Sequence, residues 1–197
     1  MTPFSKLAED YEEYLLRLIF GRDISISACA RNAYGDFKRT LKGIGKLSNG
    51  DVLHAKAEKV LTDALMALKA RLGNPVVQSD FDKWHRKTCE DLVAVYGETF
   101  AFHEGQAQKW VNMTLKYIFT VGEEHIPGFS PVYTLCHAPI DNIVLDELTR
   151  YGFDSPSKAW SQFDYEEYFK CQEWMRHKFA PTPLLSVEFH LWMGLDE

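Results

Sequence analysis

Apolar residues in this chain recur at steps of three and four positions, which is the spacing of one face of an α-helix. The stretches that follow this rule are residues 3–20, 24–41, 51–72, 79–96, 102–121, 142–151, 165–179 and 183–192. No stretch of any length alternates apolar and polar residues as a half-buried strand does. The pattern therefore predicts an all-α fold.

Residues with special backbone chemistry separate these stretches. Helix ends are expected at Gly21, Gly97 and Gly73-Asn-Pro75, and helix caps at Asp51, Asp141 and either Ser79 or Asp80. Residues 43–50 and 122–140 read as loops because glycine or proline recurs in both. The second loop is long, and its apolar residues Phe129, Val132, Tyr133 and Leu135 indicate an ordered segment.

Two segments of the chain carry polar residues at positions from which they can form one site. In the stretch 102–121, Lys109, Asn112 and Lys116 recur at helical steps on one side, next to an apolar row that contains Trp110. The segment His137-Ala-Pro-Ile-Asp141 is a loop that runs into a helix, with Asp141 at the cap position. We expect the two segments to meet, so that a lysine and a carboxylate face one substrate.

Composition narrows the class of protein. The chain has 197 residues, of which 46% are hydrophobic and 14% aromatic, and it can therefore bury a substantial core. Its four cysteines lie far apart without a C-x-x-C pair, which excludes the usual zinc and iron–sulfur spacings and indicates reduced thiols. The sequence has no signal pattern and no apolar run of membrane-spanning length. We expect a soluble, cytoplasmic protein without membrane association.

The net charge of −6 argues against a generic DNA-binding domain, which would be basic. One basic cluster could still supply local phosphate contacts: Arg31, Lys38, Arg39, Lys42 and Lys46. A solvated helix face and a phosphate-binding patch are both open interpretations of this cluster.

Common catalytic signatures are absent from the sequence. It contains no Walker loop, no G-x-S-x-G, no H-E-x-x-H and no acidic metal-binding array, and its seven histidines show no ligand spacing. We therefore predict no metal site and no cofactor. The remaining candidate for catalysis is a lysine near an aspartate. An amine can act as a nucleophile, and an ionised carboxylate can stabilise a sugar carbon that develops positive charge.

The segments Gly105-Gln-Ala-Gln-Lys109-Trp and Ala138-Pro-Ile-Asp141 resemble the helix-hairpin-helix superfamily of DNA glycosylases, in which a Pro-x-Asp segment supplies the catalytic aspartate. Lys109 and Asp141 are 32 positions apart, which is similar to the archaeal 8-oxoguanine glycosylase branch. Leu41-Lys-Gly-Ile-Gly-Lys46 is similar to the phosphate-binding hairpin of such proteins. The resemblance implies one domain of two helical lobes, residues 1–20 with 100–197 and residues 21–99, with a cleft between them.

The resemblance also implies catalytic roles. Lys109 would attack the deoxyribose C1′ of a flipped nucleotide and displace the base, and Asp141 would stabilise the cationic sugar; elimination could then nick the strand. If Lys109 only positions the substrate, Asp141 could orient a water molecule, and the enzyme would cut the glycosidic bond alone. The expected partner is double-stranded DNA that carries a modified base, 8-oxoguanine by analogy, bound by a monomer.

Further residues are candidates for substrate contacts. Candidates for the base pocket are Trp110, Met113, Tyr133, His137 and Trp160. Candidates for contacts with DNA are Arg39, Lys42, Lys46, Gln106, Gln108 and Lys116. Structural roles in a core or on a solvated surface are the competing interpretation for all of them.

Two other functions fit the same sequence. A phage-defence glycosylase would remove a hypermodified base from phage DNA and would need a roomier pocket. A non-catalytic all-α interaction or scaffold protein would use Lys109 and Asp141 only as structural residues, and the acidic net charge favours it.

Overall fold

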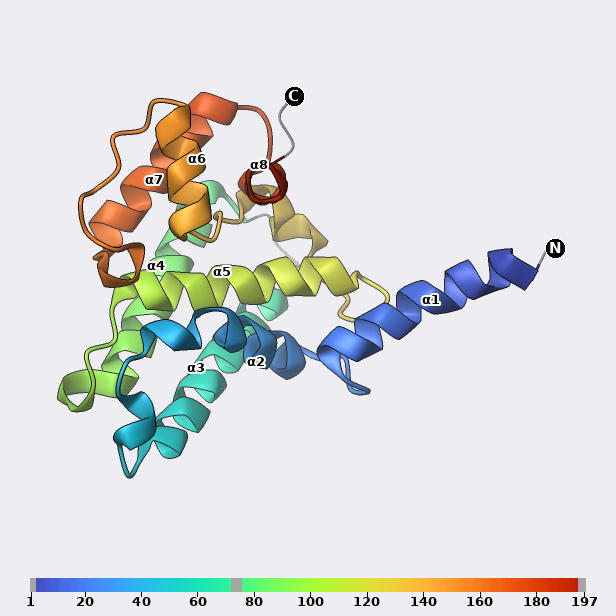
Figure 1. The fold of residues 1–197 in the computed structure, drawn as a ribbon, viewed down its shortest axis with the longest axis horizontal. Coiled ribbons are helices and arrows are strands. Elements are labelled where there is room, and N and C mark those ends of the chain that lie inside the picture. Colours follow the sequence, from blue (N-terminus) through green and yellow to red (C-terminus); the bar gives the residue numbers. More distant parts are fainter. Residues whose placement is uncertain (1–2, 72–75, 195–197) are drawn as a thin grey trace.

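A computed structural model describes residues 3–71 and 76–194 of the chain. Its helices are α1 (Pro3–Phe20), α2 (Ile26–Phe37), α3 (Gly50–Arg71), α4 (Gln78–Tyr96), α5 (Glu104–Val121), α6 (Asn142–Arg150), α7 (Tyr165–Phe179) and α8 (Leu184–Met193) (Figure 1). Short 3₁₀ turns lie at Lys38–Thr40, Ile44–Lys46, Gly97–Thr99, Ser130–Leu135 and Trp160–Gln162. The described residues contain no strand, and the predicted all-α class is confirmed.

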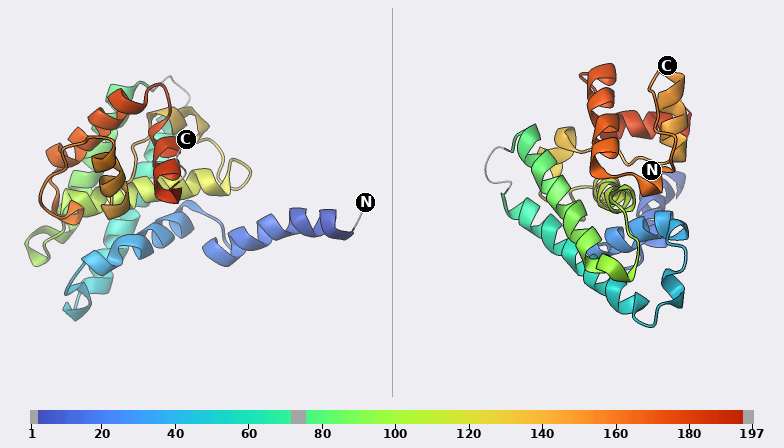
Figure 2. Two further views of the ribbon diagram at one scale, coloured as in Figure 1. Left: turned by 45° about the horizontal axis from the view of Figure 1, so that its top comes forward. Right: turned by 90° about the vertical axis from the view of Figure 1, so that its left-hand side faces the viewer.

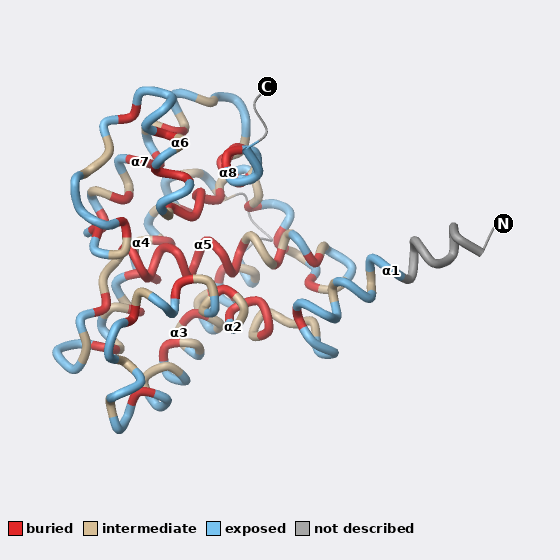
Figure 3. The backbone as a smooth tube through the Cα atoms, viewed as in Figure 1, coloured by how far each residue is buried: buried red, intermediate tan, exposed pale blue. Residues whose placement is uncertain are grey.

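Helix α5 is the centre of the fold. Seen end-on in the right-hand view of Figure 2, it lies between α2, α3 and α4 on one side and α6, α7 and α8 on the other. Every residue from Gly105 to Leu115 is buried, so this part of the helix is covered on all sides (Figure 3). A helix with no solvated face must also satisfy its polar side chains internally. The residues that do so in α5 form much of the candidate site.

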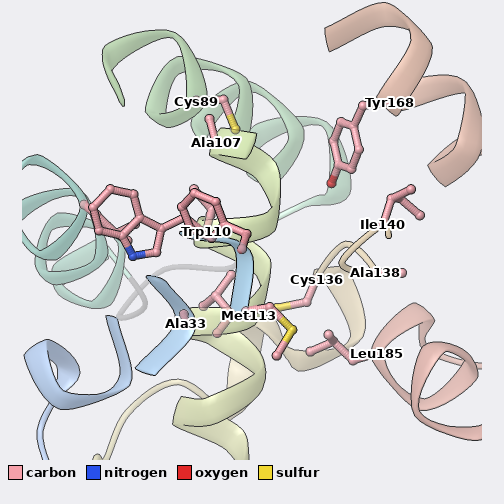
Figure 4. Close-up of a cluster of buried hydrophobic side chains, with 14 of the residues drawn as sticks. Ala33, Cys89, Ala107, Trp110, Met113, Cys136, Ala138, Ile140, Tyr168 and Leu185 are labelled. Carbon is pink, nitrogen blue, oxygen red and sulfur yellow. The ribbon is translucent and has the colours of Figure 1, made fainter. Parts of the chain in front are cut away.

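Trp110 and Met113 of α5 point to different parts of the core (Figure 4). Trp110 reaches toward α2, and its indole N–H donates a hydrogen bond to the carbonyl oxygen of Ala30 at 2.8 Å. Met113 lies on the side of Cys136 and Leu185. All four cysteines are free and buried.

Most helix boundaries agree with the sequence pattern, and the exceptions have local causes. The stretch predicted as one helix over 24–41 ends at Phe37 and continues as a 3₁₀ turn. Asp51 does not cap α3, because the helix already begins at Gly50, whose missing side chain allows the carbonyl of Ile44 to approach closely. Val77, not Ser79 or Asp80, precedes α4. The predicted stop at Gly73-Asn-Pro75 lies outside the described residues.

Helix α1 extends away from the rest of the molecule (Figure 1). Its apolar residues Tyr11, Tyr14 and Leu18 are exposed by 59%, 57% and 67% of their surface. The helical spacing in this stretch therefore predicted the helix correctly but not a buried face. None of the described helices combines the length and apolar character needed to cross a bilayer.

The start of α5 is held against the 3₁₀ turn at Trp160–Gln162 by a glycine. The Gly105 N–H donates to the carbonyl oxygen of Phe163 at 2.9 Å. A Cβ atom at Gly105 would lie 2.0 Å from the carbonyl oxygen of Trp160, which is far inside van der Waals contact. Only glycine allows this approach without displacing the backbone.

We expect Gly105→Ala to lower the free energy of unfolding by about 1–3 kcal/mol, because the added methyl group overpacks a backbone contact. The matched control is Gly35→Ala in α2, where a Cβ atom meets nothing within 4 Å. There the better helix propensity of alanine should raise stability by about 0.5–1 kcal/mol. Urea denaturation of the two variants tests this, and equal changes would contradict the packing argument.

Candidate active site

Lys109 and Asp141 form an ion pair between two helices. The Lys109 Nζ lies 2.7 Å from Asp141 Oδ2, and the two side chains are 6% and 17% exposed. The other carboxylate oxygen of Asp141 accepts a hydrogen bond from the Val144 N–H at 3.1 Å and caps α6. The predicted meeting of the two segments is confirmed, as is the predicted cap.

Buried amides fix the loop that delivers Asp141. Gln108 accepts a hydrogen bond from the Ile140 N–H at 3.2 Å and donates to the Ile140 carbonyl at 2.9 Å. Gln172 of α7 makes the same pair of contacts with Ala138, both at 2.9 Å. The backbone just before Asp141 is thus clamped from two helices, which gives its carboxylate a defined position.

The ion pair opens into a cavity of about 560 Å³, called here the Lys109 cavity. It lies between α2, α5, the start of α6 and α8, and its walls are Gly35, Asp36, Arg39, Lys109, Met113, Lys116, Tyr117, Thr120, Asp141, Ile143, Glu188, Phe189 and Trp192. This volume is in the range of small-molecule sites.

The end of the Lys109 cavity near α8 holds a second ion pair. Lys116 Nζ lies 2.6 Å from Glu188 Oε2, and 5.1 and 5.6 Å from the ring centres of Phe189 and Trp192. Glu188 is 1% exposed, and burial raises the pKa of its carboxyl although Lys116 acts in the opposite direction. Its Oε1 is buried and has no hydrogen-bond partner among the described residues.

A third polar pair lies on the α2 side of the Lys109 cavity. The Tyr117 hydroxyl donates to Asp36 Oδ2 at 2.8 Å. Burial raises the pKa of both groups, and for the Asp36 carboxyl the Tyr117 hydrogen bond and nearby cations partly offset this effect. Since Asp36 belongs to α2 and Tyr117 to α5, the pair joins two walls of the cavity.

The structure brings only some of the predicted contact residues to this cavity. Met113, Lys116 and Arg39 line it. Arg39 also lines a neighbouring hollow of about 560 Å³, the Trp160 hollow, together with Lys42, Gln106 and Trp160. Lys46 is exposed and lines neither space. Tyr133 lines a third space, described below.

Three predicted contact residues lie in the core, and their interpretation as substrate contacts is corrected. Trp110 is fully buried against α2, because its ring packs on Phe37 and Tyr34 and its N–H is bonded to Ala30. Gln108 uses its amide to hold the loop before Asp141. His137 belongs to a separate buried network.

That network links four elements beneath the candidate site. His137 donates from Nε2 to Asp82 at 2.8 Å, and its Nδ1 is hydrogen-bonded to the hydroxyl of Tyr168 at 2.8 Å. Asn112 of α5 donates to the same hydroxyl at 2.8 Å. Burial lowers the pKa of His137 to about 4. Burial alone would raise the pKa of Asp82, but hydrogen bonds from His137 and Arg176 hold it below its ordinary value.

Sequence reasoning missed Asp36, Glu188, Phe189 and Trp192 as lining residues. A signal for Glu188 was present, since it is the one charged residue in the apolar run Leu184–Met193 of α8. A lone carboxylate in such a run is costly to bury and marks a position with a specific partner.

Within residues 3–71 and 76–194, no three acidic, histidine or cysteine side chains are arranged to hold a metal ion. Comparison of the chain with family models, curated proteins and solved structures finds no match in any of the three.

The buried network predicts how stability depends on pH. Between pH 6.5 and about 4 the unfolded His137 binds a proton that the folded protein excludes. The free energy of unfolding should therefore fall as the pH is lowered through this window, by about 3 kcal/mol for this residue. Denaturation of wild type and His137→Asn across the window tests this, and identical pH slopes would contradict it.

Proposed function

We propose that the protein is a DNA glycosylase with lyase activity that removes a modified base from a flipped-out nucleotide. The observation that carries the proposal is the Lys109–Asp141 pair, nearly buried and open to a cavity of about 560 Å³. A buried ion pair is weak evidence for stability, because desolvation of both charges offsets their attraction. An amine and a carboxylate held together beside a cavity are the groups that a covalent mechanism at a sugar carbon requires.

In the proposed reaction the Lys109 amine bonds to the deoxyribose C1′ as the glycosidic bond breaks, and the departing base takes the bonding electrons. The amine must lose a proton, and the Asp141 carboxylate 2.7 Å away can accept it. Asp141 passes this proton to the departing base, and the regenerated carboxylate then faces the positive charge that develops on the sugar. Opening of the sugar ring leaves an imine, from which elimination nicks the strand.

The far end of the Lys109 cavity suits a nucleobase. Phe189 and Trp192 offer aromatic surface, which offsets the few kcal/mol that extrusion of a base from the duplex costs. In this arrangement the sugar lies near Lys109 and the base extends along α5 toward Lys116.

Local contacts can hold the DNA backbone despite the net charge of −6. Arg39 lines both the Lys109 cavity and the Trp160 hollow, and Lys42 lines the latter. In the proposed complex these two cations contact phosphates next to the flipped nucleotide. The helix-hairpin-helix arrangement, with a DNA cleft between two lobes, is part of the same proposal.

The first test is covalent trapping. Incubation with duplexes that carry different modified bases, in the presence of borohydride, should give a protein–DNA adduct with at least one of them, because borohydride reduces the imine. Lys109→Gln should abolish the adduct, whereas Lys83→Gln, which changes an exposed lysine of α4, should preserve it. Release of base without an adduct would instead favour water as the nucleophile.

The second test separates chemistry from folding. Asp141→Asn keeps an N-cap oxygen for α6 but removes the charge, so base release should fall about 10²–10⁴-fold. The variant leaves Lys109 without its counter-ion, at a cost of about 3–5 kcal/mol of stability. Single-turnover assays are therefore run at a temperature where circular dichroism shows the variant folded.

The double variant Lys109→Gln/Asp141→Asn is the control for stability. It removes both charges and should unfold at a higher denaturant concentration than Asp141→Asn. A scaffold protein would show these stability changes without any base release from the wild type, and that result would refute the proposed function.

A further inference from the structure

A second cavity adjoins the Lys109 cavity beyond Lys116. It has a volume of about 690 Å³ and is called here the Tyr133 cavity; its walls are Lys116, Phe119, Thr120, Ser130, Tyr133, Leu185, Ser186, Phe189 and His190. Lys116, Thr120 and Phe189 line both cavities. These shared side chains make the two spaces neighbours.

The two cavities follow one another along α5. Lys109, Met113, Lys116 and Thr120 recur at steps of four, three and four residues, so they lie on one face of the helix. At 1.5 Å per residue, Lys116 is about 10 Å and Thr120 about 16 Å along the axis from Lys109. A base whose sugar lies at Lys109 therefore has its remote edge toward Lys116 and the Tyr133 cavity.

The walls of the Tyr133 cavity define the chemistry of what it can hold. Phe119, Leu185 and Phe189 are apolar. The ammonium of Lys116 is already paired with Glu188, so its charge is balanced without an anionic group on the ligand. The Tyr133 hydroxyl and the Ser186 hydroxyl are bonded to each other at 2.8 Å, which leaves one O–H and several lone pairs for a ligand.

We propose that the Tyr133 cavity is a subsite for a substituent on the nucleobase. The substrate is then a base whose edge remote from the sugar carries an uncharged, largely apolar group at least as large as a benzyl group. This inference rests on the proposed glycosylase function and adds to it the substrate class. A base without such a group occupies the Lys109 cavity and leaves the second cavity to water.

The test compares matched duplexes in which one base carries a methyl or a benzyl group at its remote edge: O6-methylguanine against O6-benzylguanine, and N4-methylcytosine against N4-benzylcytosine. In single-turnover assays the wild type should release at least one benzyl-substituted base at least tenfold faster than its methyl counterpart. Faster release of the methyl-substituted base in both pairs would overturn the proposal.

Two variants fill the Tyr133 cavity from positions one turn apart on α8. Ser186→Phe and His190→Trp should each reduce release of the benzyl-substituted base at least tenfold more than release of the methyl-substituted base. His190 is exposed at its position on α8, so its replacement does not disturb the core. Ser157→Phe, at an exposed position outside both cavities, is the matched control and should change neither rate.

The outcomes separate the two proposals. An equal loss for both bases in the filled variants would mean that the cavity holds a neighbouring part of the DNA, and the substituent subsite would be refuted. If borohydride traps an adduct with 8-oxoguanine while neither benzyl-substituted base is released, the glycosylase proposal stands and the subsite falls. If no duplex gives trapping or base release, both fail.

Discussion

The ion pair between Lys109 and Asp141 joins the central helix to the start of α6, and much of the structure around it serves to hold it in place. Both charges are largely removed from water and pair with each other, and Asp141 also accepts a hydrogen bond from the Val144 N–H. Gln108 and Gln172 fix the backbone that carries Asp141. In the proposed reaction a defined position for this loop matters, because a displacement of 1 Å can cost a hundredfold in rate.

Helix α5 has two tasks that depend on its position in the molecule. Its first turns are enclosed by protein, which is possible because Gly105 lets the backbone of the Trp160–Gln162 turn approach. On one face of this helix, the buried side chains of Lys109 and Met113 and, one turn farther on, Lys116 line the wall of a cavity. The same helix thus packs into the core through Trp110 and carries the paired lysines Lys109 and Lys116 on another side.

Charge is unevenly distributed around the two cavities. Two lysines and one tyrosine in the wall of the Lys109 cavity are each paired with a carboxylate. The pairs are Lys109 with Asp141, Lys116 with Glu188, and Tyr117 with Asp36. Because these carboxylates are paired, the charge around the Lys109 cavity is nearly balanced. An acidic protein can then carry a cation such as Arg39 in the cavity wall without a basic surface overall. This balance also leaves the neighbouring Tyr133 cavity largely apolar, and this contrast suggests a substrate with a polar reacting end and an apolar extension.

The sequence by itself determined the helices and the cap at Asp141, because helical periodicity and capping depend on residues within a few positions of one another. It also indicated that Lys109 shares a helical face with Lys116. Only the tertiary structure decided which groups meet: Lys116 with Glu188, 72 positions away, or Trp110 with Ala30, 80 positions away. Periodicity identifies a buried face but not the partner that covers it, and for that reason Trp110, Gln108 and His137 read as contact residues although packing places them in the core.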